Sequence, residues 1–190
     1  MSLSLLLNDA SADSGAAKER RRFNLTADLT YSSNSIVTKN TGSTLGASTS
    51  STFSAVEIGA DYFFHPRFAA TAQMLFTLTS SIDSEIKGYD VGVRYYPFKP
   101  GYQSEVELLG SKIESTPGWV SFLYGGFSNR DYQFSNSSIS FQGAEFGGGF
   151  EYHFEQHFFL RGGANYQMLQ NTTSRTLSGF VASVGLGYAF

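Results

Sequence analysis

The chain has 190 residues, a formal net charge of -3 and an unusual balance of 15% charged residues against 16% aromatic residues. Lys and Arg are too few and too scattered to follow a phosphate backbone, which excludes a nucleic-acid partner, and no segment approaches the roughly 20 apolar residues of a membrane helix. Ordinary soluble domains carry about 25% charged residues, so the composition favours a protein whose surface meets lipid.

The first 22 residues are expected to form a flexible arm, because they are rich in Ser, Ala and Asp and lose all periodicity after Leu7. From Phe23 onward apolar and polar residues alternate, which is the period of a β-strand. The alternation predicts a single barrel domain over residues 23–190. Its strands, about eight in number, are expected at about residues 23–31, 55–64, 69–78, 88–96, 119–129, 144–154, 158–168 and 179–190.

The fifth of these segments has the least certain register, and we expect Val120, Phe122 and Tyr124 to face outward there. The connections alternate in kind. Short turns are expected at residues 65–67 and 155–156, and polar loops at residues 33–51, 80–85, 131–137 and 171–176. The connection at residues 98–118 is longer, and its centre fits either a strand extension or a helical turn.

A soluble barrel with an apolar interior would alternate in the same way, but three features favour lipid on the outside. The polar set is built from small residues that suit the crowded interior of about eight strands. Aromatic residues gather at strand ends, as in the girdles that flank an apolar band about 25 Å tall. The alternation also continues to Phe190, as closure requires where lipid cannot hydrate an open edge. The predicted fold is therefore all-β: a closed antiparallel transmembrane β-barrel of about eight strands with a polar, filled interior.

Two stretches resemble small outer-membrane barrels of the OmpA/OmpX type and the wider outer-membrane β-barrel domain superfamily. Residues 183–190, Ser-Val-Gly-Leu-Gly-Tyr-Ala-Phe, are similar to the C-terminal signal that the barrel-assembly machinery recognises, with Gly185, Tyr188 and Phe190 as its main residues. Residues 91–98, Val-Gly-Val-Arg-Tyr-Tyr-Pro-Phe, resemble the end of a central strand. The resemblance implies a fold and an assembly route, but the superfamily includes adhesins, anchors, channels and enzymes, so it does not select a function.

Several charged residues fall on the polar face of the strands and are expected inside the barrel: Asp28, Glu57, Asp61, Asp90, Arg94, Glu145, Glu151 and Arg161. Because buried charges must be paired and hydrogen-bonded, they should form a lumen charge network. A structural plug and a gate or proton path are both consistent with it. The excess of carboxylates over arginines predicts that some carboxylates are protonated, hydrated or close to the rim.

Residues His65, His153 and His157 map to the same end as the termini, where we expect solvated, interfacial histidines. Their spacing and the absence of Cys do not support a metal site. No motif indicates a catalytic residue or a cofactor.

The leading hypothesis is a non-enzymatic barrel with a role in envelope integrity or surface interaction. A narrow channel for small solutes and a lipid-modifying enzyme are the alternatives. The expected partners are outer-membrane lipid, the barrel-assembly machinery during biogenesis, and a surface ligand bound through residues 33–51, although that stretch also fits a plain polar loop. The expected location is the outer membrane of a Gram-negative-type bacterium, with both termini in the periplasm.

Overall fold

The computed structural model describes residues 23–38, 47–82, 85–101, 104–108, 111–115, 118–134, 137–155, 157–172 and 175–190, so the predicted arm at residues 1–22 lies outside the described residues. The regular elements are β1 (Phe23–Thr38), β2 (Ala47–His65), β3 (Phe68–Ser80), β4 (Glu85–Tyr95), β5 (Ser104–Leu108), β6 (Ser111–Ser115), β7 (Trp119–Phe134), β8 (Ser137–His153), β9 (Phe158–Gln170) and β10 (Arg175–Ala189). Within these ranges no helix is long and apolar enough to cross a membrane.

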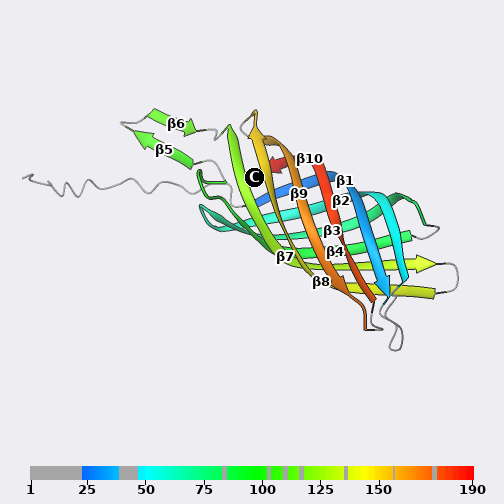
Figure 1. Cartoon of the computed structure of the whole chain (residues 1–190). Coiled ribbons are helices and arrows are strands. Elements are labelled where there is room, and N and C mark those ends of the chain that lie inside the picture. Colours follow the sequence, from blue (N-terminus) through cyan, green and yellow to red (C-terminus); the bar gives the residue numbers. More distant parts are fainter. Residues whose placement is uncertain are drawn as a thin grey trace, which may run out of the picture.

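Eight strands close into one antiparallel barrel in the order β1-β10-β9-β8-β7-β4-β3-β2 (Figure 1). The first and last strands pair without interruption from Asn24 opposite Ala189 to Thr38 opposite Arg175. The backbone N–H of Phe190 also donates to the carbonyl oxygen of Phe23 at 2.9 Å. The predicted all-β closed barrel is therefore confirmed.

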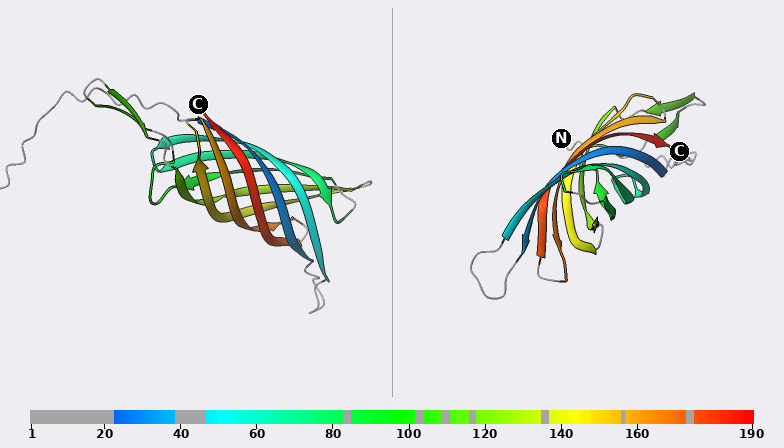
Figure 2. Two further views of the ribbon diagram at one scale, coloured as in Figure 1. Left: turned by 90° about the horizontal axis from the view of Figure 1, so that it is seen from above. Right: turned by 90° about the vertical axis from the view of Figure 1, so that its right-hand side faces the viewer.

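The barrel has two different ends. The terminus end holds Phe23, Phe190 and the connections β2–β3, β4–β7 and β8–β9, and the loop end holds the other connections. Strands β5 and β6 form a separate antiparallel hairpin beyond the terminus end (Figures 1 and 2). The long connection at residues 98–118 thus contains strands rather than a helical turn.

Burial follows the predicted alternation in every barrel strand except β7. On β1, for example, Leu29 is 57% exposed while its neighbour Asp28 is 2% exposed. From the terminus end through the middle of the barrel, the exposed members of these strands are apolar and the inward members are mostly polar. This arrangement is the reverse of a water-soluble barrel and fits a lipid-facing wall.

The register expected for the fifth strand was wrong. Val120, Phe122 and Tyr124 on β7 are buried in the barrel interior, while Trp119 and Leu123 face outward. Both alternating sets of this strand are apolar at its start, so hydrophobicity alone could not choose between them. Because side chains alternate with a period of two, the one-residue error moved every side chain of β7 to the wrong face.

Aromatic side chains surround the outer wall at the terminus end. Ring pairs there join Phe23 to Phe190, Phe68 to Tyr95, Trp119 to Tyr152, and Phe158 to Tyr188, with centroids 4.8–5.9 Å apart. Nearer the loop end, Tyr166 lies 4.9 Å from Phe180 and 5.7 Å from Phe146. These aromatic residues flank a band of Ala, Val, Leu and Gly, as in the girdles of membrane barrels.

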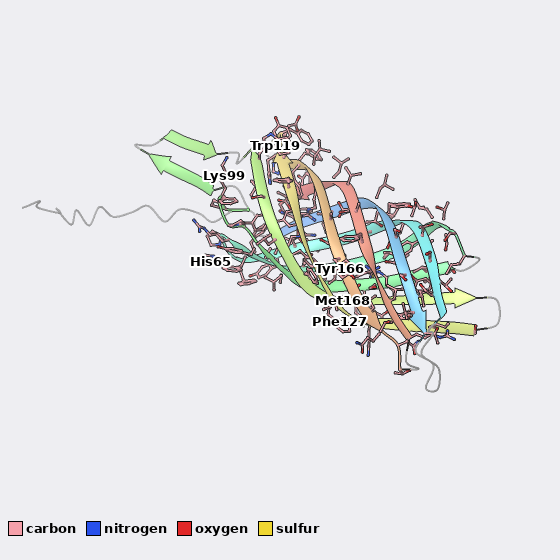
Figure 3. All side chains as sticks on the ribbon, in the orientation of Figure 1. His65, Lys99, Trp119, Phe127, Tyr166 and Met168 are labelled. Carbon is pink, nitrogen blue, oxygen red and sulfur yellow. The ribbon has the colours of Figure 1, made fainter. Side chains whose placement is uncertain are left out.

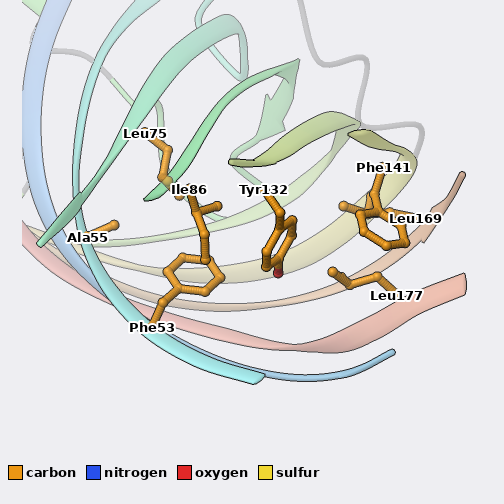
Figure 4. Packing of buried hydrophobic residues seen from close by; sticks show 8 residues of the cluster. All are labelled: Phe53, Ala55, Leu75, Ile86, Tyr132, Phe141, Leu169 and Leu177. Carbon is orange, nitrogen blue, oxygen red and sulfur yellow. The ribbon is translucent and has the colours of Figure 1, made fainter. Parts of the chain in front are cut away.

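The strands continue beyond the loop-end aromatics, and there the two faces exchange their chemistry. Outward positions become polar, as at Thr52, Lys87 and Asp131, and the adjacent inward positions become apolar. The inward residues form a buried cluster to which seven of the barrel strands contribute (Figure 4): Phe53, Ala55, Leu75, Ile86, Tyr132, Phe141, Leu169 and Leu177. The interior is therefore not polar throughout, as the sequence had suggested, because the barrel wall at this end faces water and encloses an apolar core.

Two predicted loops are largely strand. Within residues 33–51, β1 runs to Thr38 and β2 begins at Ala47, and residues 39–46 lie outside the described residues. Within residues 131–137, β7 runs to Phe134 and β8 begins at Ser137. Serine-rich sequence suggested loops, but cross-strand pairing and the inward apolar residues override that local preference.

We predict that Trp119, the one tryptophan of the chain, reports the corrected register of β7. Its side chain is 65% exposed and lies at the terminus end of the barrel (Figure 3). In refolded protein, lipids brominated near the headgroup should quench its fluorescence more strongly than lipids brominated near the chain end. In a Trp119→Phe background, Leu123→Trp should be quenched by brominated lipid and Val120→Trp should not. If the tryptophan at position 120 were quenched and the one at position 123 were not, the register expected from the sequence would be correct.

Candidate functional site

All of the charged residues expected in the lumen are buried in the barrel interior, with exposed fractions between 0% and 6%: Asp28, Glu57, Asp61, Asp90, Arg94, Glu145, Glu151 and Arg161. The structure divides them into two ion-paired groups, with Asp28 and Glu57 outside both. Arg130 is a further member that the sequence reasoning missed.

The first group lies toward the terminus end and is centred on Asp61 of β2. Its carboxylate accepts hydrogen bonds from Arg94 of β4 and from Arg161 of β9. Arg161 also donates to Oε1 of Glu151 through Nε at 2.9 Å and through Nη2 at 2.7 Å. The group therefore ties together strands that are not neighbours in the sheet.

Tyr96, directly after β4, extends this group. Its buried hydroxyl donates to Glu151 Oε1 at 3.2 Å. His153 Nε2 lies 3.5 Å from the other oxygen of Glu151. Glu151 Oε1 thus accepts from both Arg161 and Tyr96, whereas Oε2 makes no hydrogen bond among the described residues.

Phe122 packs beneath both guanidinium groups of this cluster. The Cζ atoms of Arg94 and Arg161 lie 5.2 and 5.8 Å from the centre of its ring. Aromatic faces attract guanidinium groups at such distances, and more strongly when both are desolvated. The inward register of β7 is what brings Phe122 here.

The second group is built around Arg130 of β7, which is 0% exposed. Arg130 makes a two-pronged contact with Asp90 of β4: Nη1 donates to Oδ1 at 2.7 Å and Nη2 to Oδ2 at 2.9 Å. Its Nη2 also lies 3.6 Å from Oε2 of Glu145. Ser128 donates to Asp90, and Asn165 donates to Glu145 Oε1 at 2.8 Å.

A glycine makes room for this arginine. Gly88 lies opposite Arg130 in the β4–β7 register. A Cβ atom on Gly88 would lie 2.3 Å from the carbonyl oxygen of Asn129 and 3.0 Å from the Arg130 side chain. Arg130 therefore crosses the bare backbone of β4 to reach Asp90.

The missing arginine explains part of the apparent excess of carboxylates, because it lowers that excess from four to three. With the predicted register of β7, Arg130 faced outward, and Asp90 and Glu145 had no cation. The sequence did contain a signal for Arg130: Asp90 and Glu145 had no cation in the predicted lumen, and the register of the nearby strand β7 was ambiguous. Asp28 and Glu57 face each other across β1 and β2, and Gln73 donates to Asp28 Oδ2 at 3.3 Å.

The three histidines differ from one another. His65 is exposed, and its Nδ1 accepts a hydrogen bond from the backbone N–H of Arg67 at 3.2 Å. His157 Nδ1 lies 2.9 Å from the carbonyl oxygen of Ala189. His153 is 5% exposed and stacks on Phe159, so it is a buried residue rather than a solvated one. Among the described residues, no three His, Asp or Glu side chains are grouped to hold a metal ion.

The residues of the expected assembly signal lie on opposite faces of β10. Tyr188 and Phe190 point outward and their rings lie 4.9 Å apart. Gly185 faces inward, where a Cβ atom would lie 2.0 Å from Oδ1 of Asp28. The missing side chain of Gly185 thus leaves room for the Asp28 side chain.

The interior is filled at successive levels. Aromatic residues close the terminus end: Phe63, Tyr96 and Phe122 belong to one buried cluster. The two ion-paired groups follow, and the apolar core fills the loop end. Chemically, the arrangement holds strands in register and fills much of the lumen with ion-paired side chains.

We predict that Arg130→Met strongly destabilises the folded barrel. Asp90 and Glu145 would remain buried without their cation, and breaking a buried pair costs roughly 3–5 kcal/mol. The measurement is urea unfolding in lipid vesicles, monitored by tryptophan fluorescence. Arg67→Met, at an exposed turn, is the matched control and should cause a far smaller loss.

A double-mutant cycle with Asp90→Asn tests the pairing itself. The combined loss should be clearly smaller than the sum of the two single losses, because the second substitution removes a charge that the first left uncompensated. Strict additivity would contradict the contact between Arg130 and Asp90.

Solved structures of bacterial outer-membrane proteins have a similar fold. Neisserial surface protein A aligns with 88% of this chain and 97% of its own, at 16% identity and a TM-score of 0.52. OprG from Pseudomonas aeruginosa aligns with 90% and 96%, at 13% identity and a TM-score of 0.55. The N-terminal β-barrel domain of OprF from the same organism aligns with 86% and 97%, at 13% identity and a TM-score of 0.50. At these identities the likeness concerns the fold alone.

No curated protein matches the sequence. The sequence profile described as "Outer membrane protein beta-barrel domain" matches residues 2–190. With the closed eight-stranded barrel and its lipid-facing wall, this match means that the chain belongs to the outer membrane protein β-barrel domain family and lies in the outer membrane.

Proposed function

We propose that this protein is a closed, non-enzymatic barrel that presents its loop end for contact at the cell surface, with its termini in the periplasm. The observation that carries the proposal is the exchange of polarity near the loop end. A strand needs about 9–11 residues to cross a bilayer, yet β1, β2, β7 and β8 have 16, 19, 16 and 17 residues.

The additional length extends the barrel wall beyond the apolar band at the loop end. Beyond the apolar band the wall carries exposed polar residues such as Ser33, Ser50 and Ser138, and it has its own apolar core. Spanning the membrane does not require such an extension. Holding the connecting loops away from the lipid headgroups does, and loops on a rigid scaffold commonly carry binding function.

The filled lumen argues against the alternative of a solute channel. Eight strands leave an interior that side chains can fill, and here Arg130, Tyr96 and Phe159 are among the fully buried residues. A solute that crossed the lumen would have to pass these buried groups and the loop-end core.

The positions of the histidines argue against a serine hydrolase that acts on outer-leaflet lipid. Such an enzyme needs a base within hydrogen-bond reach of its nucleophile. His65, His153 and His157 all follow or precede connections at the terminus end, and their described contacts are with the backbone, Glu151 and aromatic rings.

The last strand is proposed to direct assembly by the barrel-assembly machinery through Gly185, Tyr188 and Phe190. Support comes from the outward, adjacent rings of Tyr188 and Phe190 at the edge of the apolar band.

A cysteine scan tests the orientation, because the chain contains no cysteine of its own. In intact cells, a membrane-impermeant maleimide should label Ser138→Cys at the loop end. Arg67→Cys, at the β2–β3 turn, should react only after the outer membrane is permeabilised. The opposite pattern would place the loop end in the periplasm and overturn the proposal.

Surface contact is tested with the same variant. Cells that make the protein should bind better than cells without it to immobilised matrix proteins, glycans or other bacterial cells. A polyethylene glycol chain attached through Ser138→Cys should abolish the gain. If cells with and without the protein bind equally well to every surface, and cells that lack it are more sensitive to detergent, the results would favour a role in envelope integrity instead.

We predict that planar bilayers containing the folded protein show no stable porin-like conductance, because the lumen is occupied by paired side chains. Arg130→Ala, which removes a large buried side chain, should increase any leak. Large ohmic steps in the unsubstituted protein would support the channel alternative.

A further inference from the structure

A groove of about 470 Å³ lies on the barrel wall across β10, β1 and β2. Its outward residues are Leu29, Tyr31, Ser54, Ala182 and Val184. The hollow arises because the large Tyr31 has two small register neighbours, Ser54 on β2 and Ala182 on β10. The other lining residues, Thr30, Ala55 and Ser183, sit at inward positions and form the floor.

The groove lies at the loop-end margin of the apolar band, so lipid is the medium that reaches it. Leu29, Val184 and Ala182 offer apolar contact, and the volume falls within the range of small-molecule sites, about 300–1,000 Å³. The outward positions described on these three strands carry no charged residue from the terminus end to the loop end. An acyl chain matches this lining.

Above the groove, hydroxyl groups cover the outward face of β1 and β2, and the exposed Phe180 of β10 lies beside Ser33. Register pairs place Ser33 beside Thr52, and Ser35 between Ser50 and Ser178. The Oγ atoms of Ser35 and Ser48 lie 3.2 Å apart. Each hydroxyl is both a donor and an acceptor, so the surface suits a ligand with many hydroxyl groups of its own.

The opposite side of the barrel differs in charge. There Lys87 and Glu85 form an exposed ion pair, and Asp131 faces outward. Sites for anionic lipid headgroups are typically rich in Lys and Arg. The outward positions described on β10, β1 and β2 instead carry hydroxyl groups and no cation, so this side complements the sugar part of a headgroup rather than its phosphate groups.

We propose that the face of β10, β1 and β2 binds one outer-leaflet glycolipid, with an acyl chain in the groove and the sugar headgroup against the Ser/Thr surface above it. The site lies outside the barrel and is independent of the lumen. Its assignment to the outer leaflet rests on the proposed orientation, but binding itself can be measured on purified protein.

Native mass spectrometry of the folded, full-length protein in micelles tests the proposal. The added probes are diglucosyl diacylglycerol, rough lipopolysaccharide and phosphatidylethanolamine, each alone. Both sugar-headed lipids should be retained in preference to phosphatidylethanolamine. Ala182→Leu, which fills the groove, should lower retention at least about tenfold, equivalent to losing contact with about two methylene groups.

Two further variants separate the parts of the site. Ala72→Leu is the matched control, because Ala72 faces lipid on β3 between Ala60 and Val91, and it should retain glycolipid normally. Thr52→Val should reduce the preference for sugar headgroups while leaving the retention of phosphatidylethanolamine unchanged.

Three results would overturn the proposal. Equal retention of all three lipids would show that no headgroup is selected. Full retention by Ala182→Leu would show that the groove is not used. Rapid disulfide dimerisation of Ala182→Cys in the membrane, absent for Ala72→Cys, would assign this face to a second copy of the chain.

Discussion

Lipid offers no hydrogen-bond partner to a peptide group, and the pairing of β1 with β10 is how this chain meets that constraint. The pairing runs from Asn24 opposite Ala189 to Thr38 opposite Arg175, so the first and last strands have no free edge in the described part of the barrel. Closure with eight strands also fixes the width of the interior, which leaves room for side chains but little else. Closing the sheet with eight strands therefore limits the space in which inward side chains must pack.

The filled interior in turn decides which charges the barrel can tolerate. Ladder hydrogen bonds specify only neighbouring strands, whereas Asp61 of β2 binds Arg94 of β4 and Arg161 of β9 across the lumen. These contacts resist a slip in register that the ladders alone would permit, because a slip would separate buried charges from their partners. Gly88 has the complementary task, since its missing side chain gives Arg130 a path to Asp90. The small residues on the inward face thus provide the space that the charged side chains need to reach their partners.

The sequence was sufficient for the fold because seven of the barrel strands alternate unambiguously, as on β1, where Leu29 faces out and Asp28 faces in. It failed on β7, where Trp119 and Leu123 compete with Val120 and Phe122 for the lipid-facing set. Hydrophobic patterning cannot resolve two apolar faces, but charge balance can: only the inward register gives Asp90 and Glu145 a cation. The site was therefore partly predictable, and its central arginine required pairing to be considered across strands. The glycolipid groove had no sequence signal, because it depends on which residues the register sets beside Tyr31.

The exchange of polarity near the loop end requires no change in strand geometry. On β2 the odd-numbered residues face inward throughout, from Phe53 in the apolar core to Glu57 and Asp61 in the lumen. The chemistry at these positions changes because the medium outside the wall changes from water to lipid. A wall in water must be polar outside and can be held by an apolar core, whereas a wall in lipid must be apolar outside and can confine paired charges. The level of the exchange therefore marks the membrane boundary on the barrel itself: it lies beyond Tyr31 on β1 and beyond Phe180 on β10, next to the row of Tyr31, Ser54 and Ala182 that lines the groove. A lipid held at that row would have its acyl chain below the boundary and its headgroup above it, as the apolar groove and the hydroxyl surface require.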